Sequence, residues 1–168
     1  KIRRKLNEYF AKLLQDENVR EFVLTDLASV MNPIREKSQK FRIWIGEGAN
    51  GKSTLMNLIY KTMNLEENGY IGTCNSTLFT RKKKDADNPN PDLYEVLSNE
   101  KRFVMMQEPE RNDSLNTDLV KELSGNDAIK VRPLYKNQTI FPQIPCRFFL
   151  SCNNFPKVGD AQYSTWRR

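Results

Sequence analysis

One eight-residue motif constrains this chain more than any other feature, and it reads Gly46-Glu47-Gly48-Ala49-Asn50-Gly51-Lys52-Ser53. It fits the pattern G-x-x-x-x-G-K-[ST] at every position. In this pattern the glycines let backbone N–H groups turn inward around phosphate groups, Lys52 reaches the β and γ oxygens, and the hydroxyl of Ser53 ligates magnesium. The motif therefore predicts a loop that binds ATP, or another nucleoside triphosphate, together with Mg²⁺. The residues expected to contact the nucleotide are Gly46, Glu47, Gly48, Ala49, Asn50, Gly51, Lys52, Ser53 and Thr54.

The segments on either side of the motif match the strand and the helix that such a loop requires. Phe41 to Ile45 is a short β-prone run, and Leu55 to Met63 has the apolar spacing of a helix. This context separates a phosphate-binding loop from a chance match. Two further β-prone runs, Arg102 to Met106 and Arg147 to Cys152, predict an α/β fold around a central, largely parallel sheet.

The N-terminal part of the chain has a helical pattern. Apolar residues recur at three- and four-residue steps from Arg4 to Met31, which predicts two amphipathic helices. Residues 1–40 are therefore expected to form a helical segment ahead of a core at residues 41–168. Because the chain begins without Met and ends on two arginines, we expect it to be a piece of a longer polypeptide, truncated at its C-terminal end.

Several shorter segments of the core also have recognisable patterns. Leu93 to Leu97 and Leu115 to Leu123 are expected to be helical, with Gly125 capping the second helix. The polar and proline-rich stretch from Asn68 to Pro91 has the composition of an exposed loop. The runs 129–132 and 138–141 are predicted to pair as a β-hairpin.

Composition limits the chemistry that the chain can perform. The sequence has no His, which excludes imidazole catalysis and His-ligated metal sites. A net charge of +6 is compatible with a polyanionic partner and equally with a solvated basic surface. The three cysteines lack the close spacing of a zinc or redox motif, so free thiols in a reducing, intracellular compartment are expected. Apolar runs are short, and we expect a soluble protein without a membrane partner.

Two polar residues follow predicted strands and are candidates for catalysis. A phosphate loop needs an acid at the end of a neighbouring strand to hold magnesium and polarise water, and Glu108, after the strand that ends at Met106, fits this place. Gln107 stands where many ATPases carry a first acid, so Glu108 is expected to act alone, with Glu110 as the alternative. Asn153 follows the next predicted strand, and its amide could bind the γ-phosphate and the attacking water. Because open α/β sheets bind ligands where their strands end, Lys52, Glu108 and Asn153 are expected to lie at one edge.

The chain ends in Trp166-Arg167-Arg168. These arginines are far in sequence from the phosphate loop of their own chain. In ring-shaped ATPases such a residue reaches the nucleotide of the neighbouring subunit, and Arg168, with Arg167 as second choice, is the candidate for this catalytic role. A solvated tail is the other interpretation.

Together these segments resemble superfamily 3 helicases, specifically the poxvirus-type primase-helicases of large DNA viruses, phages and mobile elements. The family has, in order, a Gly-x-Gly-x-Asn-Gly-Lys-Ser loop, a strand ending in Glu, Lys-x-Leu-[Ser/Thr]-Gly-x-Asp, Arg-x-Leu-Tyr, a strand ending in Asn, and Trp-Arg-Arg. One departure is Asn126, at the second position of the family's Gly-Gly-Asp. The matching segments are Gly46–Ser53, Phe103–Glu108, Lys121–Asp127, Arg132–Tyr135, Asn153–Pro156 and Trp166–Arg168.

The resemblance implies an AAA+-like P-loop NTPase core, a homo-hexameric ring, and ATP-driven unwinding of single-stranded or forked DNA in viral or mobile-element replication. A viral protein of this kind would work in the host cytoplasm or nucleus. The resemblance also implies a pore hairpin in which Lys130, Arg132 and Lys136 grip phosphates and Tyr135 stacks on a base. An exposed hairpin kept soluble by its charge is the alternative. No segment resembles the family's primase module.

Two other functions remain open at this point. A DNA-packaging or origin-remodelling ATPase would carry the same motifs without unwinding DNA. A nucleotide kinase also uses a phosphate loop, but it needs an arginine-rich lid and an acceptor pocket within one chain. The segment from Lys121 to Lys136 and the terminal arginines favour a ring motor over a kinase.

Overall fold

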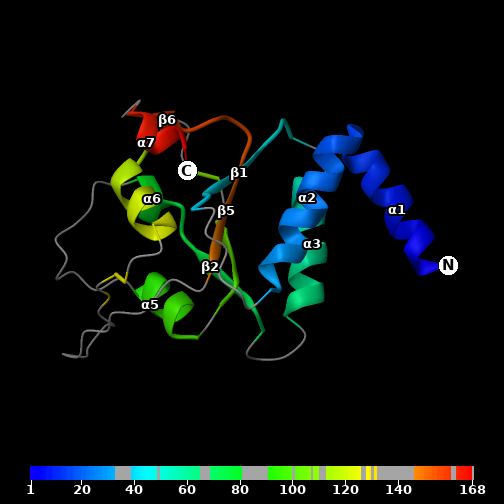
Figure 1. Cartoon of the computed structure of the whole chain (residues 1–168), viewed down its shortest axis with the longest axis horizontal. Coiled ribbons are helices and arrows are strands. Elements are labelled where there is room, and N and C mark those ends of the chain that lie inside the picture. The colour runs from blue at the N-terminus through cyan, green and yellow to red at the C-terminus, as the bar shows by residue number, and fades with distance from the viewer. Residues whose placement is uncertain are drawn as a thin grey trace.

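A four-stranded parallel sheet forms the centre of the structure, with helices on both of its faces (Figure 1). The computed structural model describes residues 1–32, 39–48, 50–64, 69–80, 91–99, 101–106, 108–109, 113–125, 128–129, 131, 146–159 and 162–167. The strands of the main sheet are β1 (Arg42–Ile45), β2 (Ile71–Cys74), β3 (Phe103–Met106) and β5 (Arg147–Cys152), while β4 (Ser114–Leu115) pairs with β6 (Lys157–Val158). The helices are α1 (Ile2–Leu13), α2 (Glu17–Val30), α3 (Lys52–Met63), α4 (Thr77–Thr80), α5 (Pro91–Ser98), α6 (Thr117–Ser124) and α7 (Tyr163–Trp166).

Polar side chains cap the N-terminal ends of α2 and α6. The carboxylate of Asp16 accepts the N–H groups of Asn18 and Val19, at 2.8 and 3.1 Å, at the start of α2. Asn116 caps α6 in the same way by accepting from Leu119 at 3.1 Å. Such a side-chain acceptor satisfies N–H groups that have no partner within the helix.

The strand order of the main sheet is β1-β5-β3-β2. Ile45 of β1 lies opposite Cys152 of β5, and Met106 of β3 lies opposite Leu150. Because the strands are parallel, their carboxyl ends meet at one edge of the sheet. Since β5 lies between β1 and β3, the loop after β5 lies between the loops that follow the other two.

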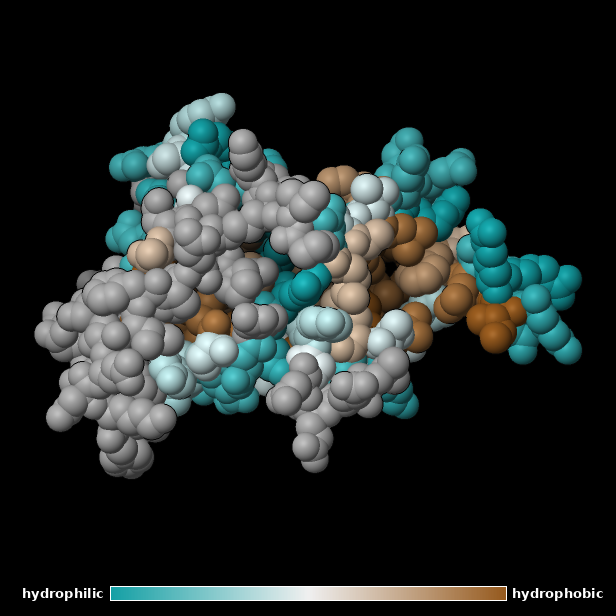
Figure 2. All heavy atoms as spheres, turned by 60° about the horizontal axis from the view of Figure 1, so that its bottom comes forward, coloured by the Kyte–Doolittle hydropathy of each residue, from teal (hydrophilic) through white to brown (hydrophobic). Residues whose placement is uncertain are grey.

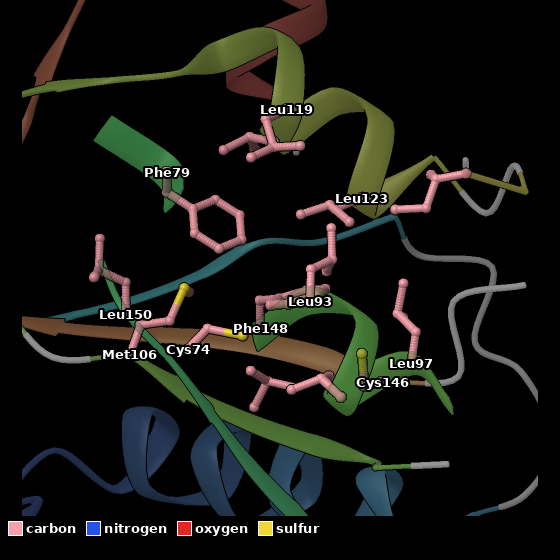
Figure 3. Packing of buried hydrophobic residues seen from close by; sticks show 14 of the residues in the cluster. Cys74, Phe79, Leu93, Leu97, Met106, Leu119, Leu123, Cys146, Phe148 and Leu150 are labelled. Carbon is pink, nitrogen blue, oxygen red and sulfur yellow. The ribbon is translucent and has the colours of Figure 1, made fainter. Parts of the chain in front are cut away.

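Alternate residues of the central strands pack on opposite faces of the sheet. Phe103 of β3 stacks on Phe149 of β5 with ring centroids 3.9 Å apart, on the face covered by α2 and α3. The opposite face is covered by α4, α5 and α6, and Figure 3 shows its cluster. Phe79 of α4 is fully buried there and packs against Phe148 at 5.4 Å. The sheet is therefore the middle layer of a three-layer fold.

Three arginines at the amino-terminal ends of the strands fix α2 to the sheet. Arg42 of β1 forms a two-point pair with Asp26, at 2.5 and 2.6 Å, and the two side chains are only 10% and 13% exposed. Arg147 of β5 donates to the hydroxyl of Ser29. Arg102, just before β3, donates to the C-cap carbonyl of α2 at 2.7 Å. Guanidinium groups at this end of a helix also complement its dipole.

In contrast to α2, α1 is held mainly by its C-terminal end. It contains no buried residue. Its Phe10 and Leu13 pack against the apolar cluster that α2 and α3 form with Phe103 and Phe149 of the sheet. Ile2 and Leu6, nearer the N-terminus, are exposed. Figure 2 shows apolar side chains among hydrophilic ones at this end of the molecule. None of the helices in the described ranges combines the length and the hydropathy needed to cross a membrane.

Most of the elements predicted from the sequence are confirmed. The α/β fold with a parallel sheet is present, the two amphipathic helices lie within residues 4–31 except for small shifts at their ends, and the strands predicted around β1, β3 and β5 form. The division at residue 40 stays a prediction. Of the predicted hairpin, only Ile129 and Val131 belong to the described residues, and both are buried.

One expectation was wrong, and another was confirmed with a different backbone geometry. The stretch from Asn68 to Pro91 contains β2 and α4 rather than a loop alone, because Ile71, Cys74 and Phe79 are buried in the core although polar residues surround them. Gly125 is the C-cap of α6, as predicted, with φ −71°, a right-handed conformation that other residues adopt equally well.

Candidate active site

The phosphate-binding motif forms the connection between β1 and α3. The N–H of Gly46 donates to the carbonyl of Cys152 at 3.3 Å, which extends the pairing of β1 with β5 into the start of the loop. Gly51 is the N-cap of α3 and has φ +86°, in the left-handed region that favours glycine. A Cβ at Gly46 would collide with the side chain of Asn50. The backbone conformation therefore favours glycine at position 51, whereas a side chain at position 46 would displace the amide of Asn50. Ala49 lies outside the described residues.

The ammonium group of Lys52 lies among four oxygen acceptors. It donates to the carbonyls of Gly46 and Glu47, the second at 3.3 Å, and to the side-chain oxygen of Asn50 at 3.1 Å. It also contacts Oδ1 of Asn153 at 3.3 Å, across the sheet edge. The only described cation of the motif is thus placed at the mouth of the loop, next to the end of β5.

Ser53 and Thr54 lie in the first turn of α3 and are exposed. Together with Gly51 and Lys52 they present the N-terminal end of a 12-residue helix, where unpaired N–H groups and the helix dipole favour an anion. Gly48 is also exposed. The predicted nucleotide contacts that belong to the described residues therefore surround one exposed helix end.

Glu108 and Asn153 form the second part of the site. The backbone N–H of Asn153 donates to Oε1 of Glu108 at 2.9 Å, and its side-chain Nδ2 donates to Oε2 at 2.7 Å. Both residues are exposed to solvent at the carboxyl edge of the sheet. The structure thus brings Lys52, Glu108 and Asn153 together, with Asn153 between the other two.

One expectation about this edge needs correction. The acid was expected on a strand next to the phosphate loop, but β5 separates β1 from β3. Because the residue after β5 is Asn153, an amide fills the gap between the cation and the acid. Gln107 and Glu110 lie outside the described residues.

The donor atoms at this edge fit a magnesium ion. Mg²⁺ is usually held in such sites by one or two protein oxygens, with phosphate and water completing its shell. The Ser53 hydroxyl and the Glu108 carboxylate are both exposed oxygen ligands of this kind. Within the described residues, no cluster of three or more His, Cys, Asp or Glu side chains offers an all-protein metal site. The donor set therefore favours a metal that binds together with a nucleotide.

Two cysteines, Cys74 of β2 and Cys152 of β5, are the last residues of their strands at this edge of the sheet. Burial raises the pKa of the Cys152 thiol, and the carboxylate of Glu108 raises it further, while the ammonium of Lys52 lowers it. Burial, followed by Asp92 and Glu95, raises the pKa of Cys74 to about 12. Both thiols stay protonated at neutral pH and are poor nucleophiles. All three cysteines are buried and none forms a disulfide with another described residue.

Arg167 lies away from the phosphate loop of its own chain. Its guanidinium donates to Oε1 of Gln39 at 3.2 Å, and its carbonyl accepts from Lys40 at 3.4 Å, both ahead of β1. The neighbouring Trp166 stacks on Phe155 with centroids 6.4 Å apart. Because Lys52 lies beyond the opposite end of β1, Arg167 does not meet it here. The other predicted residues of this group, Arg168, Lys130, Arg132, Tyr135 and Lys136, lie outside the described residues.

Sequence analysis missed two contacts of the site. Ser76, after β2, donates to the carbonyl of Glu108 at 3.4 Å and helps to place the acid. Leu13, at the end of α1, occupies the space where a side chain at Gly51 would lie. Ser76 could have been found only by recognising β2, and no local pattern connects Leu13 with the loop.

A family model described as a family of unknown function, DUF5906, matches residues 44–168. The chain belongs to this family. The match begins within β1 and includes the phosphate loop, Glu108 and Asn153.

Named relatives come from large DNA viruses. A “Putative helicase” of Acanthamoeba polyphaga mimivirus is 31% identical over 97% of this chain, and a protein of the same description from Frog virus 3 is 30% identical over 98%. A “Putative primase” of African swine fever virus is 26% identical over 75% of the chain. The chain spans 16% of the length of the first two relatives and 12% of the third. The predicted resemblance to helicase and primase proteins of large DNA viruses is confirmed.

Solved structures of the NrS-1 C-terminal region share the fold. One apo structure matches 90% of this chain and 33% of its own with a TM-score of 0.60 at 15% identity. Another matches 93% of this chain and 35% of its own with a TM-score of 0.59 at 18% identity. At these identities the likeness concerns the fold, and it agrees with the α/β class predicted from the sequence.

Proposed function

We propose that this chain is the NTP-hydrolysing core of a DNA motor, a helicase of viral or mobile-element replication. The observation that carries the proposal is the contact of Asn153 with both Lys52 and Glu108 at one edge of the sheet. A loop cation, an acid and an amide within hydrogen-bonding reach are the groups that transfer of a phosphoryl group to water needs.

Each group has a distinct role in this proposal. Lys52 and the N–H groups at the start of α3 hold the β and γ phosphates and neutralise charge that develops on them. Ser53 and Glu108 would hold Mg²⁺, which would supply further charge neutralisation at the phosphate oxygens. Glu108 orients the attacking water and accepts its proton. Asn153 fixes the carboxylate through two hydrogen bonds while its Oδ1 faces Lys52.

The proposal includes a homo-hexameric ring with catalysis between subunits. Arg167 is bound to Gln39 ahead of β1, at the other end of the strand from the phosphate loop. An arginine at this position is better placed to contact the nucleotide of a neighbouring chain than the nucleotide of its own chain. The stack of Trp166 on Phe155 joins this region to the segment that follows Asn153.

DNA is the proposed partner, inside the infected or host cell. Support comes from the viral relatives named as helicases and a primase, and from the net charge of +6. In this proposal, Lys130, Arg132 and Lys136 bind the phosphates of DNA and Tyr135 stacks on a base.

The test is ATP hydrolysis by the intact protein, with and without forked DNA, beside the Lys52→Ala variant. We expect DNA-stimulated hydrolysis that Lys52→Ala abolishes, because no other described cation of the loop can replace the ammonium group. Lys61→Ala, an exposed change in the last turn of the same helix, is the matched control and should hydrolyse ATP normally. Hydrolysis by Lys52→Ala at the wild-type rate would refute the assignment of the loop.

Further readouts separate the competing functions. Strand displacement on forked DNA is expected of a helicase, whereas a packaging or origin-remodelling ATPase would hydrolyse ATP with DNA but separate no strands. Transfer of the γ-phosphate to a nucleotide acceptor would identify a kinase instead. The mass of the intact protein with an ATP analogue and DNA tests the hexamer.

A further inference from the structure

Leu13, the last residue of α1, contacts the phosphate loop at Gly51. A Cβ built on Gly51 would collide with Cδ1 of Leu13. Gly51 also has φ +86°, a backbone conformation that favours glycine whatever the space around it. A methyl group of Leu13 therefore fills the place that a side chain at Gly51 would occupy.

The N-terminal helices contact the chain at both ends of β1. At the amino end of the strand, Arg42 is bound to Asp26 of α2 by two short hydrogen bonds within a nearly buried pair. At the carboxyl end, Leu13 meets Gly51 in the loop that follows the strand. The two N-terminal helices thus contact both ends of the strand that carries the loop. Leu13 and Phe10 pack on the same cluster as Leu55 of α3, which anchors this contact in the core.

An apolar side chain suits this position. The first N–H groups of α3 have no acceptor within the helix, and a methyl group offers them none. The N–H of Lys52 donates to Oδ1 of Asn50 at 3.4 Å, and the N–H groups that follow it stay available for phosphate oxygens. The half-buried Leu13 also excludes water from one side of Gly51, and charge interactions are stronger where water is excluded.

We propose that Leu13 is a positioning residue for the triphosphate, which acts by holding Gly51 and the start of α3 in the shape that receives phosphates. The inference rests on the proposed nucleotide site. Leu13 contacts the loop at Gly51, whereas Glu108 and Asn153 follow β3 and β5, so its loss should weaken nucleotide binding more than the chemical step. A merely structural role would lower stability without separating KM from kcat.

The experiment compares four variants of the intact protein. Leu13→Ala removes the contact, Leu13→Val keeps a branched apolar side chain that is too short to reach Gly51, and Leu13→Met keeps a side chain long enough to reach it. Leu6→Ala is the matched control, because Leu6 lies on the same helix but is 39% exposed and remote from the loop in sequence. Binding of a fluorescent ATP analogue with Mg²⁺ gives Kd, and steady-state hydrolysis gives KM and kcat.

We expect Leu13→Ala to weaken binding and raise KM roughly tenfold while kcat changes by less than about threefold, since misplaced binding groups cost affinity. Leu13→Val should fall between Leu13→Ala and the wild type, Leu13→Met should approach the wild type, and Leu6→Ala should match it. Thermal unfolding of each variant establishes that it is folded.

A folded Leu13→Ala protein with wild-type Kd and KM overturns the inference, and so does an equal loss in Leu6→Ala. If Leu13→Ala does not fold, Leu13→Val provides the test instead. Wild-type affinity for the nucleotide in that variant also overturns the inference. Failure of the wild-type protein itself to bind the analogue refutes the proposed nucleotide site, which is a different result from an unchanged variant.

Discussion

Asn153 holds both oxygens of the Glu108 carboxylate. Its backbone N–H donates to Oε1 at 2.9 Å and its side-chain Nδ2 donates to Oε2 at 2.7 Å. Two donors on one carboxylate fix its plane as well as its position. The amide turns its own Oδ1 toward Lys52, at 3.3 Å. The placement of the acid therefore depends on the residue that follows a different strand, β5.

Replacement of Asn153 by Ala should slow hydrolysis more than it weakens binding. The variant loses the side-chain hydrogen bond to Glu108 and the contact with Lys52, while the backbone N–H bond remains. Loss of one preorganised polar group costs about 10²-fold in kcat in comparable sites. Steady-state phosphate release from the intact protein measures this. Asn154→Ala, an exposed change at the next residue, should leave kcat unchanged, and a similar loss in both variants would argue against a specific role for Asn153.

Glu108→Gln should bind nucleotide without hydrolysing it. Gln keeps the size of the side chain and one oxygen that can accept from Asn153, but it lacks the charge that holds Mg²⁺ and orients water. Equilibrium binding of an ATP analogue beside phosphate release separates the two effects. Glu95→Gln, an exposed change in α5, is the control with the same chemistry. Parallel loss of binding and hydrolysis in Glu108→Gln would indicate a structural role instead.

Phe79→Ala should destabilise the fold, by about 3–5 kcal/mol in the free energy of unfolding. Phe79 is fully buried between Phe41 and Phe148, with ring centroids 5.2 and 5.4 Å away. Urea unfolding followed by circular dichroism measures the change. Phe22→Ala removes the same ring from an exposed position and should change stability by less than about 0.5 kcal/mol. A small effect at Phe79 would mean that α4 does not contribute to the core.

The parts of the site that could be predicted from the sequence are local. The loop motif, the strand before it and the helix after it follow one another directly, so their physical requirements can be recognised in a short window. Glu108 and Asn153 could be placed at strand ends for the same reason. Their contact could not be predicted, because it depends on β5 lying between β1 and β3, and strand order is set by packing of the whole sheet.

The elements that the sequence did not reveal are short or depend on distant contacts. β2 has four residues, including Gly72 and Thr73, which is too few to establish an alternating pattern. The burial of Phe79 comes from Phe41 and Phe148, which are distant in sequence. Leu13 fits the amphipathic pattern of α1, but nothing in that pattern shows that its methyl group reaches Gly51.

Arg168 is predicted to act on the nucleotide of a neighbouring subunit. The adjacent Arg167 is bound to Gln39 ahead of β1, whereas Lys52 follows the other end of that strand. An arginine supplied across an interface contributes about 10³–10⁵ in rate, so Arg168→Ala should be nearly inactive. Intact protein carrying Arg168→Ala, mixed with inactive Lys52→Ala protein, should form rings in which some interfaces pair an intact arginine with an intact loop. Phosphate release should then appear at intermediate mixing ratios and vanish toward either pure variant. If native mass spectrometry confirms mixed rings and no ratio restores activity, Arg168 does not act in trans.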